Sequence, residues 1–575
     1  MTGTRKTAGL MILVSVLLAA GAANAASRKA KEMLAFIPAE TPYAMVSLEP
    51  IPDALAGKIE PAMDDVLEGY QRILRYVMAE QLVELANQED GAEQAARLQG
   101  VVDEVIGLMS IEGIRGAGIA RDSAFAVYGY GLLPVLRTEL TAAAAFEAAI
   151  SRIEEKAGEK LPVGEVANHA YRFVDLDELK VIIATIGDYA VITLVPGAFE
   201  KEQLEAVLGI SKPRNNLAKS KELSVLARKY GFTDHFSGFI DVQRIAASFL
   251  GDPSGLNKDL FDIVEYDSAT ISDVCKTEFK ALAGVAPRIA FGYSDVNEKF
   301  IDSRLVVELR KDIAKGLAAL PAFVPGLGLD PGGFMSLGFS MNPLAARAFY
   351  EARLDAMEAE PFECEAFAEL QASVPQGREA LAQPVPPVVY GFRGVLLNVF
   401  DIVGLDLATD EPPESVDASV LLAVENAQDL VTMAAMMDPQ IAALNLLPDG
   451  KPVRLDMPQL AELADDAFVA LSELALTLAL GNDAEKRAAG MLNAKSVEPP
   501  PLFSISMDSA RYYALMGEAM MLEPDSEEEE PMPLPMRTAM RDITVAAGSL
   551  YERMIVNVRL TETGVDVDSR LTLKQ

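Results

Sequence analysis

The sequence predicts an α+β fold made of two homologous halves, each with a largely antiparallel sheet and flanking helices. Short motifs occur twice and in the same order, as an internal duplication requires. The pairs are AFIP at 35–38 with AFVP at 322–325, GIRG at 113–116 with GFRG at 391–394, FSxxxDxxR at 236–244 and 503–511, and DSRL at 302–305 and 568–571. Strand-like and helix-like segments also recur together, which favours an α+β unit over an alternating βαβ array.

Amphipathic helices and β-branched strands make up the first half. Four segments are expected to be helices: 63–78, 92–109, 142–156 and 199–208. The segments 124–133 and 179–195 are rich in β-branched and aromatic residues, which predicts strands. A turn is expected at Gly187 and Asp188, inside the second of these segments.

The same order of elements is expected in the second half. Helices are predicted to start at Pro343, Asn426 and Asp483, and strands at Val388, Val416 and over 474–480. Each half is expected to end in a β-hairpin. These hairpins are 289–294 with 300–309, and 555–560 with 565–573.

These patterns divide the chain into a leader at 1–25, a first half at 26–320 and a second half at 321–575. The stretch 321–333 is rich in Pro and Gly and is interpreted as a linker between the halves. The stretch 523–535 is acidic and rich in proline, so it is expected to form a surface loop of the second half.

The first 25 residues have the three parts of a secretory signal: a basic start at 5–6, an apolar run at 10–20 and a small-residue site ending at Ala25. A membrane-spanning helix needs about 20 apolar residues, so this run is short for an anchor. We expect cleavage after Ala25 and a periplasmic location. Retention of the segment as an anchor is the alternative.

The charge of the chain restricts its partners. The formal net charge of −35 becomes −37 when the leader, which carries Arg5 and Lys6, is removed. Binding to nucleic acid or to anionic lipid needs lysine and arginine, so neither is expected as a partner. A solvated surface explains the acidity, and a basic or calcium-bearing partner is the alternative. No integral membrane span is expected in the mature chain.

The chain has two cysteines, Cys275 and Cys364. A pair of cysteines in an exported protein predicts a disulfide, which here would connect the two halves. Two unrelated buried thiols are the alternative. Neither cysteine belongs to a CxxC motif, so neither redox catalysis nor a zinc site is indicated.

The segment 190–250 contains a strand, a short helix, NLAKS at 216–220, a helix to Tyr230 and a strand ending in FID at 239–241. It resembles a module of exported bacterial proteins of unknown function that contain repeated strand-helix modules. The resemblance implies a β-rich, repeated, extracytoplasmic fold, and it transfers no functional residue.

The repeated acidic residues are Asp241 and Asp508, each followed three residues later by an arginine. Each aspartate follows a strand and precedes a helix, where a carboxylate accepts backbone N–H groups. Both are therefore expected to be structural helix caps. A functional carboxylate is the alternative.

Other residues of types that can take part in catalysis or binding form no recognised catalytic pattern. His169 and His235 belong to no metal-ligand or nucleophile motif. The glycines at 326–333 lack the lysine of a phosphate loop. Arg115 and Arg393 are flanked by glycines, and each is expected to be a buried strand residue that connects neighbouring elements, with an anion site as the alternative. No catalytic residue, cofactor or metal is predicted.

We expect an exported, non-catalytic binding or envelope-interaction protein. Its partner would be an apolar small molecule, a peptide or an envelope protein, bound where the halves meet against apolar or methionine-rich helices. One alternative is a carboxylate-dependent hydrolase, which needs Asp241 and Asp508 within roughly 5–10 Å of each other. The other alternative is a purely structural envelope scaffold.

Overall fold

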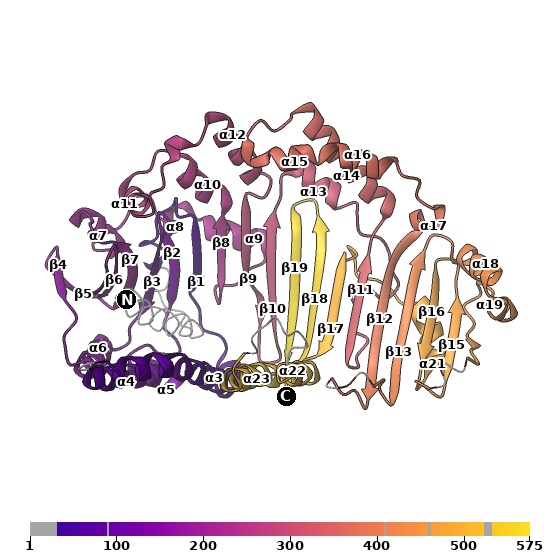
Figure 1. Cartoon of the computed structure of the whole chain (residues 1–575), viewed down its shortest axis with the longest axis horizontal. Helices are drawn as coiled ribbons and strands as arrows, with labels where there is room; N and C mark the ends of the chain where they lie inside the picture. The colour runs from indigo at the N-terminus through magenta and orange to yellow at the C-terminus, as the bar shows by residue number, and fades with distance from the viewer. Residues whose placement is uncertain are drawn as a thin grey trace.

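A computed structural model gives the fold of residues 32–88, 91–407, 409, 411–457, 460, 462–522 and 532–575. The predicted leader at 1–25 lies outside these described residues, as does most of the acidic stretch 523–535. The fold is α+β, as the sequence predicts, with a large antiparallel sheet and flanking helices. Figure 1 shows the sheet as a broad curved wall with helices along its upper and lower edges.

The strands of the described residues form one 19-stranded sheet in which neighbouring strands are antiparallel. From its outer edge to the centre, the first half has the order β4 (Val163–Val166), β5 (His169–Leu176), β6 (Leu179–Ile186), β7 (Tyr189–Pro196), β3 (Leu133–Glu139), β2 (Phe125–Tyr130), β1 (Tyr43–Ser47), β8 (Ser237–Asp241), β9 (Arg288–Val296) and β10 (Phe300–Glu308). The expected turn at 187–188 separates β6 from β7.

The second half continues the sheet from the centre to the other edge. Its order is β19 (Gly564–Leu573), β18 (Tyr551–Thr561), β17 (Phe503–Asp508), β11 (Met335–Ser340), β12 (Phe392–Val403), β13 (Ser415–Val424), β16 (Ala475–Leu480), β15 (Ala467–Leu471) and β14 (Val453–Arg454). Outward from the centre, the two halves thus place strands in the same succession, and β4 alone has no equivalent among the described residues. A duplication would produce this match, although the common origin of the halves stays a prediction.

The halves meet where β10 pairs with β19. Ser303 lies opposite Ser569, and their Oγ atoms are 2.7 Å apart. The DSRL motif complements itself in an antiparallel pair, because its aspartate then faces the arginine of the other copy. Asp302 accordingly bonds Arg570 at 2.7 Å. An approximate two-fold axis normal to the sheet therefore passes between the two serines.

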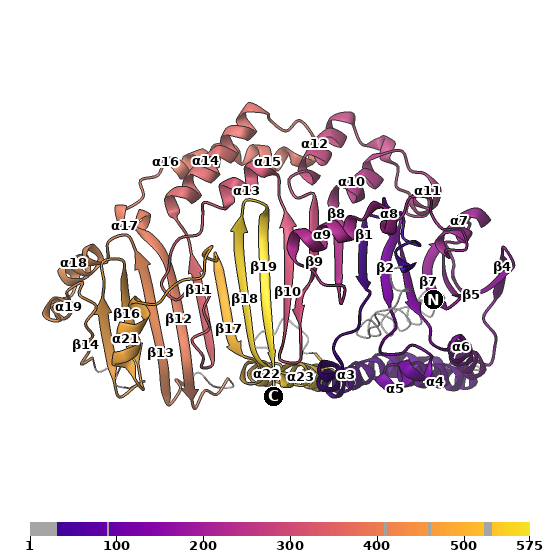
Figure 2. The ribbon, with the colours of Figure 1, turned by 180° about the vertical axis from the view of Figure 1, so that it is seen from behind.

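Helices border the sheet on both edges and on its back. The lower edge has α3 (Asp53–Ala86), α4 (Gly91–Leu108), α5 (Ile111–Gly116), α6 (Ala143–Ala157), α22 (Ser509–Ala519) and α23 (Leu534–Ser549). The upper edge has α10 (Val242–Leu250), α11 (Gly255–Ile263), α12 (Asp273–Ala283), α13 (Lys311–Leu317), α14 (Pro343–Ala359), α15 (Ala368–Ala372), α16 (Val374–Ala382) and α17 (Pro387–Tyr390). The back, seen in Figure 2, has α8 (Leu217–Ser220), α9 (Glu222–Tyr230) and α21 (Ala484–Leu492). Three further helices, α7 (Lys201–Val207), α18 (Ala427–Met437) and α19 (Pro439–Ala443), lie toward the two ends of the sheet among the described residues.

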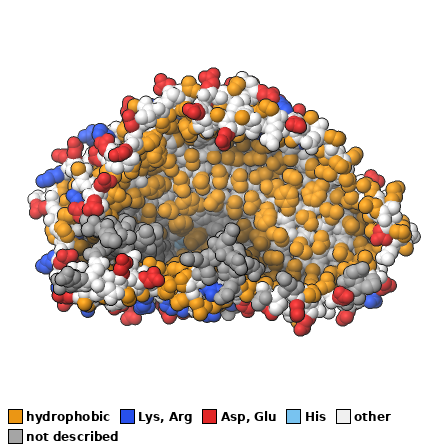
Figure 3. Space-filling model, viewed as in Figure 1, with side chains coloured by type: hydrophobic (Ala, Val, Ile, Leu, Met, Phe, Trp, Pro, Cys, Tyr) orange, Lys and Arg blue, Asp and Glu red, His pale blue; other side chains and the backbone are white. Residues whose placement is uncertain are grey.

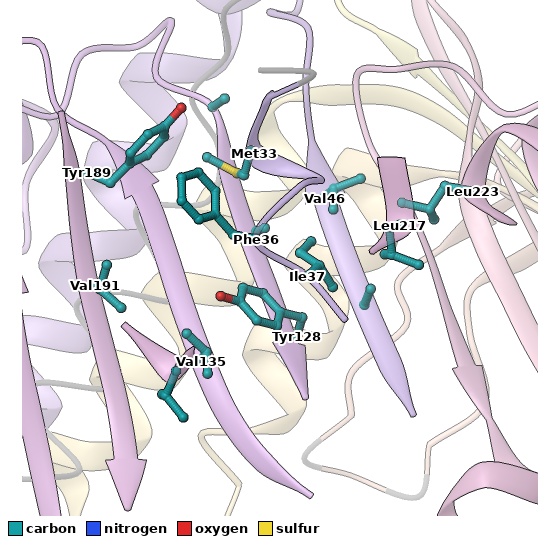
Figure 4. Close-up of a cluster of buried hydrophobic side chains, with 14 of the residues drawn as sticks. Met33, Phe36, Ile37, Val46, Tyr128, Val135, Tyr189, Val191, Leu217 and Leu223 are labelled. Atoms are coloured by element: carbon teal, nitrogen blue, oxygen red, sulfur yellow. The ribbon is translucent and has the colours of Figure 1, made fainter. Parts of the chain in front are cut away.

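The largest hydrophobic core lies on the back of the first half (Figure 4). Phe36 and Ile37 pack there against side chains of the sheet, including Tyr128 and Val46. In the second half, Val324 and Leu327 are fully buried against Leu396. The segment 321–333, which the sequence predicts to link the halves, is therefore packed against the back of the sheet through its apolar residues.

Further expectations differ from the structure. The strand expected from Val388 begins at Phe392, and Pro387–Tyr390 forms the helix α17. The GIRG motif at 113–116 lies in α5, whereas Arg393 of the GFRG motif lies in β12. The glycines of 113–116 do not interrupt the helix, because Ser110 caps its start and accepts a hydrogen bond from the Gly113 N–H. The Arg115 side chain is 46% exposed and pairs with Glu60, so it is not the expected buried strand residue. The predicted loop at 523–535 also ends early, since α23 begins at Leu534.

Contacts at both edges reinforce the junction of the halves. On the lower edge, α3 packs against α23, and Arg72 bonds Asp542 at 2.6 Å. Gly69 allows this approach, because a Cβ there would lie 2.2 Å from Ile543. On the upper edge, Cys275 and Cys364 lie at disulfide distance, with Sγ atoms 2.01 Å and Cα atoms 4.8 Å apart.

We predict that the unreduced, denatured protein shows no titratable thiol. Replacing both Cys275 and Cys364 with serine should lower the free energy of unfolding by up to about 4–5 kcal/mol, because the bond closes a long loop in the unfolded chain. Thiol titration and urea unfolding measure these outcomes. Two free thiols in the unreduced protein would contradict the bond.

We also predict a pH-dependent contribution from Asp542. Burial raises the pKa of this carboxyl, but hydrogen bonds and charge from Arg541 and Arg72 outweigh it and leave the pKa below its ordinary value. The ion pair thus stabilises the fold above about pH 4, and this is lost as the pH falls through the lowered pKa. Asp542→Asn should cost about 0.5 kcal/mol at pH 7, since the pair is partly exposed. Urea unfolding should show the difference from wild type vanish near pH 2, and a constant difference would contradict the assignment.

Candidate functional site

Asp241 lies at the start of α10 and is almost fully buried. Its Oδ1 accepts a hydrogen bond from the Arg244 N–H at 2.9 Å. Its Oδ2 lies 3.2 Å from the Arg288 guanidinium, and Glu222 bonds both arginines. Asp241 is therefore part of a charged cluster as well as a helix start, which the motif alone did not indicate.

Asp508 has a simpler environment at the start of α22. It accepts a hydrogen bond from the Arg511 N–H at 3.0 Å, and the Arg511 side chain turns to Asp401. Five strand spacings separate β8 from β17, which places the two aspartates about 24 Å apart or more. This distance is too long for the paired carboxylates that a hydrolase would need.

We predict different costs for equivalent substitutions of the two aspartates. Asn caps a helix about as well as Asp, so Asp508→Asn should change stability by less than about 0.5 kcal/mol. Asp241→Asn removes a charge-assisted bond to Arg288 and should cost about 2 kcal/mol. Urea unfolding of both variants tests this, and equal costs would argue against the buried cluster.

Each histidine ring lies beside a backbone carbonyl group. His169 Nδ1 lies 2.9 Å from the Ala167 carbonyl oxygen, and His235 Nδ1 lies 3.4 Å from that of Glu49. Within the part of the chain that the structure describes, no group of three or more His, Cys, Asp or Glu side chains could hold a metal.

A pocket of about 430 Å³ lies beside His169, between β5, β6 and α6. Arg172 lines it and bonds Glu147 at 2.6 Å and Glu154 at 2.9 Å. Burial raises the pKa of Glu147, but hydrogen bonds from Thr185 and Arg172 outweigh it and lower the pKa. Glu147 is thus held ionised in a satisfied ion pair, which does not suit a general acid.

A much larger feature is the front face of the sheet. Figure 3 shows this face as a hollow lined with hydrophobic side chains and surrounded by charged ones. Cross-strand partners share a face, so the strand register identifies the residues that line it. We call the following residues the concave floor: Ile289, Phe291, Leu305, Val307, Val565, Val567, Val556, Val558, Phe503, Ile505, Leu337, Phe339, Val395, Leu397, Val420 and Leu422.

Every side chain of the concave floor is partly exposed, although all are apolar. Leu305 and Leu337, near its centre, are 38% and 36% exposed. Ser303 and Ser569 lie among them, and their hydroxyls bond to each other. The strands that carry the floor are paired on both sides, so their backbone N–H and C=O groups are hydrogen-bonded to neighbouring strands. The floor therefore presents hydrocarbon to its surroundings.

The opposite face of the central strands is charged. Arg304 pairs with Asp566, Arg559 with Asp568, and Arg570 with Asp302. An antiparallel sheet normally turns its polar face to water and packs its apolar face on a core. Here the apolar face is the one that the described residues leave open.

Helices enclose the margins of the concave floor. Leu55 of α3 packs against Ile301 and Leu573 at the lower margin. Phe146 of α6 covers the sheet at one end, and Val431 of α18 covers it at the other. Burial raises the pKa of Tyr551 at the lower margin to about 12 and also raises that of Tyr293. These shifts indicate a poorly hydrated environment beside the floor.

The sequence reasoning missed the concave floor and expected a cleft between the halves. The halves instead meet strand to strand. A local pattern could have revealed the floor: Ile301, Leu305 and Val307 alternate with Asp302 and Arg304 in β10. What this pattern cannot reveal is that no described segment covers the apolar side.

Comparisons with known proteins give no relative for this chain. No family model, curated protein or solved structure matches it. Among the described residues, no helix is long and apolar enough to cross a membrane. The arrangement of the chain's own residues therefore carries the functional argument.

Proposed function

We propose that this protein binds the acyl chains of lipids on its concave floor and acts as a non-catalytic carrier or acceptor of lipid. The observation that carries the proposal is a continuous apolar face across the centre of the sheet, which no segment among the described residues covers. Each methylene group removed from water on such a face contributes about 0.8 kcal/mol.

The chemistry of the floor favours acyl chains over a peptide or a protein. Protein interfaces contain about one hydrogen bond per 100–200 Å². At the centre of the floor the polar side chains are Ser303 and Ser569, which bond each other. A peptide backbone laid there would lose its hydrogen bonds to water without replacement, which is costly. Hydrocarbon has no such requirement.

The dimensions of the floor also suit lipid. The floor residues lie on eight neighbouring strands from β9 to β13, which span seven spacings, or about 33 Å. Five residues along each strand cover about 17 Å. One acyl chain is about 15 Å long, half of the roughly 30 Å hydrocarbon core of a bilayer. Several chains could therefore lie side by side along the strands.

A periplasmic location is part of this proposal. It is supported by the signal-like residues 1–25 and by the cysteine pair at disulfide distance. The duplication is supported by the shared strand succession of the halves. The hydrolase alternative is disfavoured by the separation of Asp241 and Asp508. A scaffold without a ligand does not explain why the apolar face is open.

We predict that the mature chain purified under mild conditions contains lipid, which native mass spectrometry and extraction will detect. Leu305→Glu combined with Leu337→Glu should lower lipid binding at least tenfold, because buried carboxylates lose their hydration beneath the acyl chains. These two residues are well exposed, so the substitutions should not prevent folding.

The matched control is Val225→Glu, an exposed apolar residue of α9 on the back of the sheet. This variant should bind lipid as the wild type does. Equal binding by the floor variant and the wild type would contradict the proposal. A lipid-free dimer of the wild type that the floor variant dissociates would show that a second copy covers the floor instead.

A further inference from the structure

We propose that α18 and α19 form a tip that contacts the surface of a zwitterionic bilayer and through which lipid reaches the concave floor. This inference rests on the proposed lipid binding, and it specifies which surface of the protein contacts the membrane that supplies the lipid. Both helices protrude at the outer end of the second half in Figures 1 and 2.

The composition of this tip is unusual for a protein that is 23% charged. The stretch 430–448 has one charged residue, Asp438, whose carboxylate accepts a hydrogen bond from the Gln440 N–H at the start of α19. Several of its large apolar side chains face solvent: Met433 is 49% exposed, Met436 80%, Met437 87% and Leu447 58%. Exposed apolar groups gathered in this way mark an interaction surface.

The first half provides an internal comparison, because α6 follows β3 as α18 follows β13. Both helices pack one face on the sheet: Phe146 and Ile150 of α6, and Ala427 and Val431 of α18. Their outer faces differ. The last turns of α6 expose Glu155 and Lys156, where those of α18 expose Met436 and Met437. Sheet packing therefore does not require an apolar outer face at this place.

The inner face of α18 connects the tip to the concave floor. Val431 and Leu430 belong to a cluster with Leu422, a floor residue, and with Leu476. An acyl chain that leaves the methionines can therefore reach the floor along apolar side chains. Methionine suits such a surface, because its flexible thioether adapts to irregular partners.

The negative charge of the chain favours contact with a zwitterionic bilayer over an anionic one. The tip has no lysine or arginine over 430–448, and the chain carries a net charge of −35. Anionic lipid would repel it, since attraction to such surfaces depends on basic residues. A zwitterionic surface imposes no such penalty and lets the apolar side chains enter the interface.

The experiment measures transfer of a pyrene-labelled phosphatidylcholine from phosphatidylcholine vesicles to the mature chain. The test variant is Met436→Glu with Met437→Lys, which gives α18 the outer charges of α6 without changing the net charge. The matched control exchanges the charges of α6, Glu155→Lys with Lys156→Glu. A milder variant, Met437→Ser, replaces only the most exposed side chain and tests the same surface if the double variant does not fold.

We expect the test variant to take up lipid at least fivefold more slowly than the wild type and to float less with the vesicles. Its lipid content after loading from detergent should be unchanged. The control should behave as the wild type, and adding phosphatidylglycerol to the vesicles should slow transfer.

The outcomes separate the two proposals. A wild type that takes up no lipid from vesicles or detergent would overturn the proposed function, and this inference with it. If the wild type and the test variants load with lipid and take it up from vesicles at equal rates, the role of the tip would be overturned, while the proposed function would stand. Loss of detergent loading in a folded test variant would show that α18 belongs to the binding surface, which would also contradict a docking role. Flotation that requires a membrane protein in the vesicles would identify a protein partner instead.

Discussion

The pairing of β10 with β19 is the interaction on which the rest of the structure depends. It joins two half-sheets along their inner edges, so that neither edge is left with unpaired N–H and C=O groups. The DSRL motif supports this pairing, since Asp302 bonds Arg570 and the two serines meet at the centre. Without it, each half would carry only part of the concave floor.

The continuity of the sheet has a consequence for its two faces. Over the middle of the central strands, residues alternate between the two faces, so the apolar row that begins at Phe291 continues through Leu305, Val567 and the strands beyond. The same alternation puts Arg304 and Asp568 on the reverse face, where they form ion pairs. The contacts of α3 with α23 and of Cys275 with Cys364 connect the two halves at the lower and upper edges of the sheet. An apolar face in contact with water is unfavourable, and for this reason we propose lipid as its occupant.

Local patterns were sufficient to predict much of the fold. The hairpin strands, the turn at Gly187 and the helix after Asn426 follow from periodicity, β-branched content and capping residues, all of which act over a few positions. The packing of the segment 321–333 could not be predicted, because burial of Val324 and Leu327 depends on distant strands. The expectation of a strand at the GIRG motif was wrong for a similar reason. A four-residue identity does not determine whether the segment is a helix or a strand. The concave floor required the complete strand order, which pairs segments hundreds of residues apart. Alternation in one strand indicates an apolar face but not whether another segment covers it.

The central claim is that hydrocarbon lies on the concave floor, and photo-crosslinking tests it most directly. The mature chain would be loaded with a phosphatidylcholine that carries a diazirine near the end of one acyl chain, irradiated, and digested for mass spectrometry. The account predicts adducts concentrated in the strands of the floor, β9, β10, β19, β18, β17, β11, β12 and β13, and their loss on competition with unlabelled lipid. Adducts on the reverse face, on the outer surface of α4 or spread evenly over the chain would contradict it.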